Sequence, residues 1–357
     1  MNQNKIILYK NYFLEKEHLF LENGSLKVSL FRYETGVEAI KVCNKKGYIV
    51  MLPYQGQQIW EISFLDHDLK MKSNFREPVK TEDFVSTYGG FLLHCGLTAM
   101  GNPSAEDTHP QHGELPNAIY QTSFLQCGED AKGKYVAVGG IYNHNKAFEV
   151  NYDFTPICKL YENASEVEVE ISFRNKRKKA LEYFYLCHIN FRPVDGLKLF
   201  YPAKRECIKI HKDIPKNMCP ERRQRLQDYM ESLEKDTTLQ DVIDSKKQCY
   251  DPEIVFTVKY DEVREAYTLG MLPDGYGYYV KHNPKELPYG IRWISRTGDE
   301  DALGMVLPAT AEHHGYLDCK KNGYERYLME GESIIYHISI GIADPKESRK
   351  ITEELAY

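Results

Sequence analysis

Several segments of the chain alternate apolar and polar residues with a period of two, which is typical of a strand with one face on a core and the other in water. The clearest is Glu166–Phe173, where acidic residues alternate with valine and isoleucine. A helix would carry acidic side chains on its apolar face, so we predict a strand. Six more strands are predicted, bounded by turn-forming residues, over 25–31, 59–64, 135–142, 254–260, 276–280 and 334–342.

One region, residues 220–243, has apolar residues at helical spacing instead, and Pro220 suits the first turn of a helix. We expect a helical insertion at about 215–250 within a single β-sandwich domain that spans residues 1–357. The insertion has three candidate roles, namely packing on the sheet edge, covering a cleft and forming a contact between subunits. No repeat or linker marks a domain boundary.

The composition narrows the classes of partner. A hydrophobic fraction of 42% in 357 residues is enough for a large core. The net charge is −6, with 46 basic and 52 acidic residues interspersed, so no basic field is available for nucleic acid or an anionic membrane. The expected partners are therefore a small molecule and a second copy of the chain in a homodimer.

Neither a signal sequence nor a membrane span is expected. The N-terminus runs directly into charged residues, and no stretch of roughly 18 apolar residues occurs. The nine cysteines are scattered without a Cys-x-x-Cys pair, a spacing that favours reduced, buried thiols over disulfides or a zinc ribbon. We therefore expect a cytoplasmic protein.

The densest polar cluster lies in residues 89–117, which are rich in glycine and proline and are predicted to form loops. His94, His109, His112 and Glu114 could exchange protons with a ligand or, if they converge, bind a metal in a cupin-type sugar isomerase. Residues in a loop have no fixed face, so their spacing does not bring these four side chains together. Neither a metal nor a cofactor is therefore expected. His94 follows an apolar run and is more often a core residue in such a setting.

Two further segments carry candidate chemistry at the ends of buried strands. In the first, His188 and Asn190 lie on one face by strand alternation, and the alternative is that His188 caps a turn. In the second, a strand runs into a loop with Glu312, a candidate base or simply an exposed carboxylate. Arg292 and Trp293 supply a donor beside an aromatic face that suits a sugar ring, although a core tryptophan is the commoner explanation.

Taken in order, these segments resemble the galactose mutarotase-like superfamily, which comprises the aldose 1-epimerases and their relatives. The resemblance spans about residues 50–345 and rests on Cys95-Gly96-Leu97, His112-Gly113, His188-Ile189-Asn190-Phe191 and the closing turn Leu328–Ser333. It implies an all-β fold, a large β-supersandwich, and the interconversion of the anomers of a free sugar by acid–base ring opening.

The resemblance also implies roles for individual residues. His188 matches the acid that protonates the ring oxygen, and His112 matches the histidine that orients the sugar. Relatives often carry a Glu-Pro pair for the base, but the matching pair here is Leu307-Pro308, so Glu312 is the base that we predict. The predicted substrate contacts are His112, Asn190, Arg292, Trp293 and His94. The alternative is a protein of the same fold that binds a sugar without turning it over.

Overall fold

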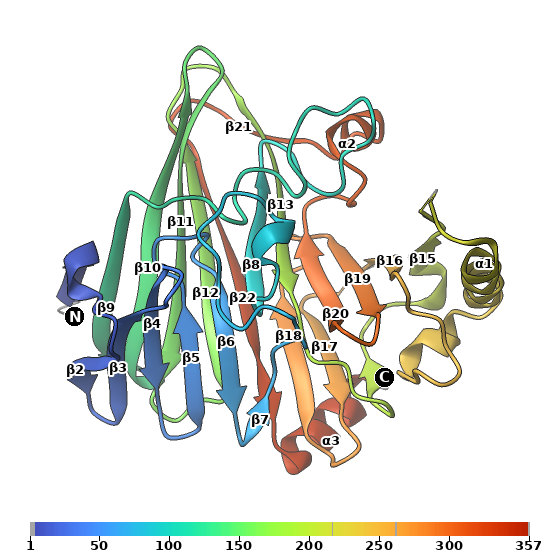
Figure 1. The fold of residues 1–357 in the computed structure, drawn as a ribbon, viewed down its shortest axis with the longest axis horizontal. Helices are drawn as coiled ribbons and strands as arrows, with labels where there is room; N and C mark the ends of the chain where they lie inside the picture. The colour runs from blue at the N-terminus through green and yellow to red at the C-terminus, as the bar shows by residue number, and fades with distance from the viewer. Residues whose placement is uncertain (1–3, 216, 261–262, 356–357) are drawn as a thin grey trace.

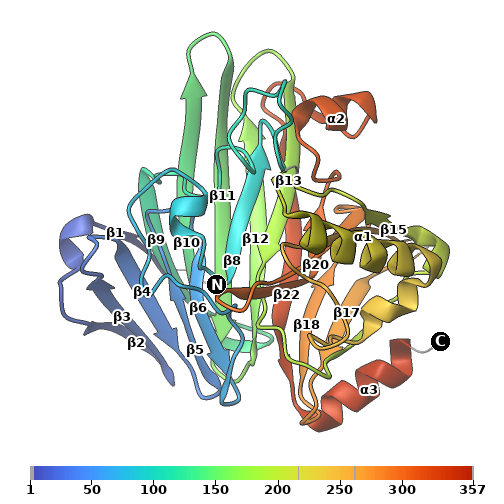
Figure 2. The same ribbon diagram turned by 45° about the vertical axis from the view of Figure 1, so that its right-hand side comes forward.

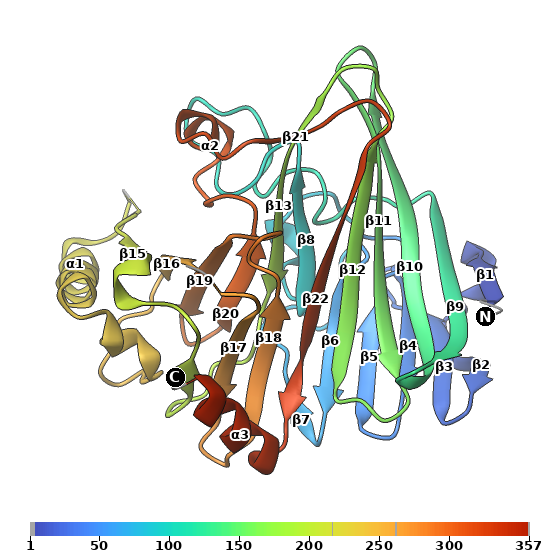
Figure 3. The same ribbon diagram turned by 180° about the vertical axis from the view of Figure 1, so that it is seen from behind.

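The computed structural model describes residues 4–215, 217–260 and 263–355, and in it two large antiparallel sheets stack face to face (Figure 1). One sheet has nine strands and the other has thirteen within these residues. Figure 3, seen from behind, shows the nine-stranded sheet in front, with the late strand β22 beside β12. The all-β sandwich predicted from the sequence is confirmed.

Neighbouring strands in each sheet often come from distant parts of the sequence. The nine-stranded sheet runs β1 (Asn4–Leu8), β9 (Thr122–Asp130), β10 (Gly133–Lys146), β11 (Val150–Tyr161), β12 (Glu166–Asn175), β22 (Ser333–Ala343), β18 (Gly277–His282), β17 (Ala266–Met271) and β14 (Lys198–Phe200). The thirteen-stranded sheet runs β15 (Ile208–His211), β16 (Ile254–Lys259), β19 (Tyr289–Arg296), β20 (Asp301–Ala309), β13 (Leu181–Ile189), β8 (Leu92–Leu97), β6 (Ile59–Phe64), β5 (Gly47–Met51), β4 (Glu38–Cys43), β3 (Leu26–Arg32) and β2 (His18–Asn23), with β21 (Arg326–Leu328) on β13 and β7 (His67–Asp68) on β6.

The core lies between the sheets and follows the alternation seen in the sequence. In β12 the residues Val167, Val169 and Ile171 are buried, while the acidic residues between them are half-exposed. Val169 pairs with Ile338 of β22, which is also buried. Full burial of such a side chain stabilises the fold by about 1.5–3 kcal/mol, so alternation along the strand fixes which face meets the core.

The helices flank the sheets. Helix α1 (Pro220–Lys235) begins at the predicted proline, is shorter than the predicted 220–243, and lies beside β15 (Figure 2). Helices α2 (Tyr316–Lys321) and α3 (Pro345–Leu355) were not predicted, and α3 packs on β17. None of the helices in the described ranges is long and apolar enough to cross a membrane.

The prediction of loop structure for the glycine-rich segment is wrong over part of its length. Residues Leu92–Leu97 form β8, a strand buried along its whole length. It pairs with β13 from Phe184 to Ile189, so cross-strand hydrogen bonds and burial outweigh the local preference of glycine for turns. The following residues, 98–121, are loop and fold over the outer face of the sheet.

Candidate functional site

A small pocket of about 190 Å³ lies on the face of the thirteen-stranded sheet that is turned away from the core. The neighbouring strands β13, β20, β19 and β16 form its floor, because alternate residues of adjacent strands point to the same face. Two loops and the segment after β20 form its walls. Its lining consists of Leu186, His188, Leu307, Ile291, Trp293, Glu253 and Val255 from the sheet and of Phe84, Val85, Tyr88, Asn102, Gln111, His112 and His313 from the walls.

His188 stands near the end of β13 and is buried. Its ring lies 5.3 Å, centroid to centroid, from the indole of Trp293 and 3.4 Å, at Nδ1, from the Tyr88 hydroxyl. Burial lowers the pKa of His188 to about 4, although the Asn190 side chain opposes this shift. The imidazole is therefore uncharged near neutral pH.

Glu253 is the carboxylate of this pocket, and the sequence analysis missed it. It directly precedes β16 and accepts a hydrogen bond of 2.6 Å from Nε1 of Trp293. Burial raises the pKa of Glu253 above its ordinary value of 4.5, and the hydrogen bond from Trp293 opposes that rise. An acidic residue at the edge of a strand is a common pattern, so only the strand order could single Glu253 out.

His112 enters the pocket from the loop above the sheet. It has a positive φ of 61°, and its backbone is held by bonds from its N–H to Gly101 O and from Gly96 N–H to its own carbonyl, both 2.9 Å. Its ring lies 5.3 Å from that of His188. The buried Nδ1 atoms of His112 and of His313 have no hydrogen-bond partner among the described residues. Buried polar atoms are rarely left without a hydrogen-bond partner.

Asn190 lies behind the pocket rather than in its lining. Its side-chain oxygen accepts a 3.0 Å hydrogen bond from the Tyr88 hydroxyl, and its Nδ2 donates to Gly90 O at 3.0 Å. The side chain is fully buried. Asn190 therefore shares the face of His188, as alternation predicts, but fixes Tyr88 against the pocket instead of reaching its interior.

The comparisons with known proteins agree with this fold. The family model DUF4432, described as a domain of unknown function, matches residues 34–342. The chain belongs to the DUF4432 family. A search of the curated proteins gives no match for this DUF4432 chain.

Solved structures similar to this DUF4432 chain include a "putative aldose 1-epimerase" from Klebsiella pneumoniae, with a TM-score of 0.80 and 13% identity over 99% of this chain and 95% of that one. A galactose mutarotase-like protein from Clostridium acetobutylicum has a TM-score of 0.58 and 11% identity, over 90% of this chain and 99% of that one. A galactose 1-epimerase from Lactobacillus acidophilus has a TM-score of 0.52 and 12% identity, over 92% of this chain and 98% of that one. The fold is that of the galactose mutarotase-like superfamily, as the sequence resemblance predicts.

Two predicted substrate contacts of this DUF4432 chain point away from the pocket. His94 pairs across the sheet with Cys187, the neighbour of His188, so it faces the core, where its Nδ1 lies 2.7 Å from the Tyr185 hydroxyl. Arg292 lies between the lining residues Ile291 and Trp293 of β19, so its side chain faces the opposite side of the sheet. There it donates a hydrogen bond of 2.7 Å to Gln240 Oε1. Neither lines the pocket, because alternate residues of a strand face opposite sides.

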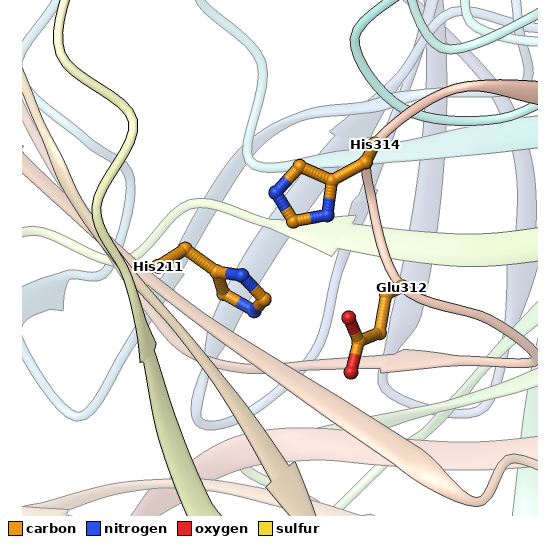
Figure 4. Close-up of side chains that lie close together, drawn as sticks. All are labelled: His211, Glu312 and His314. Atoms are coloured by element: carbon orange, nitrogen blue, oxygen red, sulfur yellow. The ribbon is translucent and has the colours of Figure 1, made fainter. Parts of the chain in front are cut away.

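Glu312, the base predicted from the sequence, also lies outside the lining. Its side chain is buried, and its carboxylate lies 3.6 Å from the ammonium of Lys209 and faces His211 and His314 (Figure 4). The intervening His313 does line the pocket. The structure thus brings together His188, His112 and Trp293, and adds Glu253 in place of Glu312.

The residues of the cupin-type alternative do not converge. Within the described ranges, none of His94, His109, His112 and Glu114 belongs to a group placed to bind a metal. The Glu114 carboxylate instead accepts hydrogen bonds from the Thr98 amide and hydroxyl and from the Tyr152 hydroxyl. Glu114 and His109 line a larger cavity of about 1040 Å³. It does not contain His188, His112 or Glu253, so we place the candidate site in the smaller pocket.

Proposed function

We propose that the pocket binds one free sugar and interconverts its anomers, with Glu253 and His188 as the proton-transfer pair. The observation that carries the proposal is that a carboxylate and an imidazole line one small pocket and that Trp293 contacts both. Pockets for drug-sized ligands enclose roughly 300–1,000 Å³, so a smaller cavity of about 190 Å³ suits a single sugar ring.

The chemistry needs one base and one acid. One group takes the proton of the anomeric hydroxyl as the bond from the anomeric carbon to the ring oxygen breaks, and the other protonates the ring oxygen. Rotation of the open aldehyde and closure by the reverse steps give the other anomer. The pair must therefore carry one proton in total.

The pKa shifts indicate where this proton resides. Burial disfavours both charged forms, so it raises the pKa of Glu253 and lowers that of His188, and both shifts favour the form in which the proton lies on Glu253. In the one-proton form the carboxylic acid is thus the donor and the neutral imidazole the acceptor. This reverses the roles implied by the family resemblance, in which His188 is the acid.

The remaining lining suits a polyhydroxylated ring. The imidazoles of His112 and His313 line the pocket and are able to hydrogen-bond hydroxyl groups, while the indole of Trp293 and the ring of Tyr88 offer apolar surface. Aromatic faces with a few polar groups are typical of sugar sites.

A second candidate function is sugar binding without turnover. Leu307, the residue that matches the base of relatives, lines the pocket and carries no ionisable group. If Glu253 did not reach the anomeric hydroxyl, the pocket would retain its binding groups and lose its base.

The test is polarimetry and exchange NMR on a panel of free aldoses. We expect anomer exchange above the spontaneous rate for one sugar class, and a loss of about 10² to 10⁴ in rate for Glu253→Gln or His188→Gln. Calorimetry on the same variants reports binding separately. Sugar binding by the wild type without faster exchange would favour the second candidate, and no binding of any aldose would reject both.

A further inference from the structure

A second cluster of imidazole and carboxylate groups lies behind the wall of the pocket. It consists of His211 at the end of β15 and of Glu312 and His314 in the segment after β20 (Figure 4). One ligand atom from each lies within 4.8 Å of the others. Figure 4 shows the three side chains directed into a common space, although His211 is about a hundred residues away in sequence from Glu312 and His314.

The two histidines of the cluster are held in the same way. Nε2 of His211 lies 2.7 Å from Thr257 Oγ1, and Nε2 of His314 lies 2.9 Å from Asp213 Oδ2. The Asp213 carboxylate only accepts, so the His314 ring donates from Nε2 and keeps the lone pair on Nδ1. The Thr257 hydroxyl can accept from or donate to Nε2 of His211, and Nδ1 of His211 carries the lone pair when the hydroxyl accepts. In each ring the remaining atom is Nδ1, and the part of the chain that the structure describes gives neither Nδ1 a hydrogen bond.

Glu312 lacks the contacts that a buried carboxylate normally has. Its side chain is 5% exposed, and its one ion-pair partner among the described residues is Lys209 at 3.6 Å, a residue whose own side chain is 67% exposed. Within the same ranges no hydrogen bond reaches the carboxylate oxygens. Burial of a carboxylate is costly unless it is paired and hydrogen-bonded, so a cation would compensate it better than this long contact.

We propose that His211, Glu312 and His314 form a binding site for one divalent transition-metal ion of the Zn²⁺ class. Two imidazoles and one carboxylate are ligands that zinc prefers, and three protein ligands leave a fourth position for water. Asp213 and Thr257 are the outer partners that orient the rings. Bonds of about 2.0–2.2 Å would draw the three side chains closer together.

The ion would fix the segment that builds one wall of the pocket. His313 lies between two of the ligands in sequence, and its ring packs 4.2 Å from that of His314 and 4.9 Å from that of His211. The site therefore holds in place a residue that lines the proposed sugar pocket. The proposed metal site does not depend on the proposed function, because metal binding is measured without sugar.

The test uses the full chain, stripped with a chelator and titrated with Co²⁺ and Zn²⁺. We expect one ion per chain by elemental analysis and a visible Co²⁺ absorption band that Zn²⁺ removes. His211→Gln and Glu312→Gln should abolish stoichiometric binding. The matched control is His67→Gln, because His67 pairs with Asp274 at 2.9 Å as His314 does with Asp213, but belongs to no such group among the described residues.

Two exposed positions keep the proposal falsifiable if a ligand variant does not fold. Asp213→Asn removes an outer partner and should weaken binding about 10-fold to 100-fold. Lys209→Ala removes the competing ammonium and should tighten binding, an effect that misfolding cannot produce. The proposal is overturned if the wild type takes up no stoichiometric ion, or if neither exposed variant changes the affinity.

Discussion

Nε1 of Trp293 donates a hydrogen bond of 2.6 Å to the carboxylate of Glu253. The same indole lies 5.3 Å from the ring of His188, so it contacts both Glu253 and His188. The hydrogen bond favours the charged carboxylate, whereas burial favours the neutral acid. Trp293 therefore tunes the protonation of Glu253 and also presents an aromatic surface to the pocket.

This contact gives the first prediction. With Glu253 and His188 as the proton-transfer pair, kcat/KM should fall on the acid side as His188, whose pKa burial lowers to about 4, gains a proton, and on the alkaline side as Glu253, whose pKa burial raises, loses one. Trp293→Phe removes the donor and raises the pKa of Glu253 further. The alkaline limb should then move to higher pH by about one unit, measured by polarimetry. Trp60→Phe, at a buried site outside the pocket, should leave the limb in place.

The second prediction separates the two candidate bases. Glu253→Gln should lower the rate of anomer exchange by about 10² to 10⁴, because it removes a proton-transfer group from the pocket. Glu312→Gln should have a much smaller effect, since its carboxylate lies outside the lining. Rates from the two variants on the same sugar decide the question. The reverse order of effects in chelator-stripped protein, where loss of an ion at Glu312 cannot contribute, would restore the base predicted from the sequence.

The third prediction concerns the loop that carries His112. A Cβ atom on Gly113, whose φ is +78°, would lie 2.2 Å from Ala99 O and 2.4 Å from Gly96 O. Gly113→Ala should therefore destabilise the fold by about 1–3 kcal/mol more than Gly133→Ala, since Gly133 also has a positive φ but has open space around it. Denaturant unfolding measures the difference. Equal destabilisation by the two variants would show that the loop relaxes around the added methyl group.

The fourth prediction concerns stability in acid. Burial lowers the pKa of His94 from 6.5 to about 3, so the unfolded chain binds a proton there before the folded one does. The free energy of unfolding should fall as the pH drops below 6.5, and His94 should contribute about 2 kcal/mol of this loss by pH 5. His94→Gln should reduce the loss between these pH values by that amount. Urea unfolding at several pH values measures this dependence. If the free energy of unfolding falls as steeply with pH in His94→Gln as in the wild type, His94 is not the cause.

The strands predicted from alternation agree closely with the structure, because burial of one face is a local pattern. Residues 59–64 form β6 with the same ends, and residues 166–173 lie within β12. The failures have long-range causes. Glycine-rich β8 is a strand because β13 pairs with it, and α3 is fixed by its packing on β17.

The sequence by itself determined the class of fold and predicted three residues that line the candidate site, His188, His112 and Trp293, because strand periodicity and a loop rich in glycine are encoded over a few neighbouring residues. Only the tertiary structure decided which carboxylate accompanies them. Glu253 reaches the pocket because β16, β19, β20 and β13 are neighbours in one sheet, while Glu312 faces His211 and His314 instead. Strand order brings distant residues onto one face, and no local pattern of residues records that order.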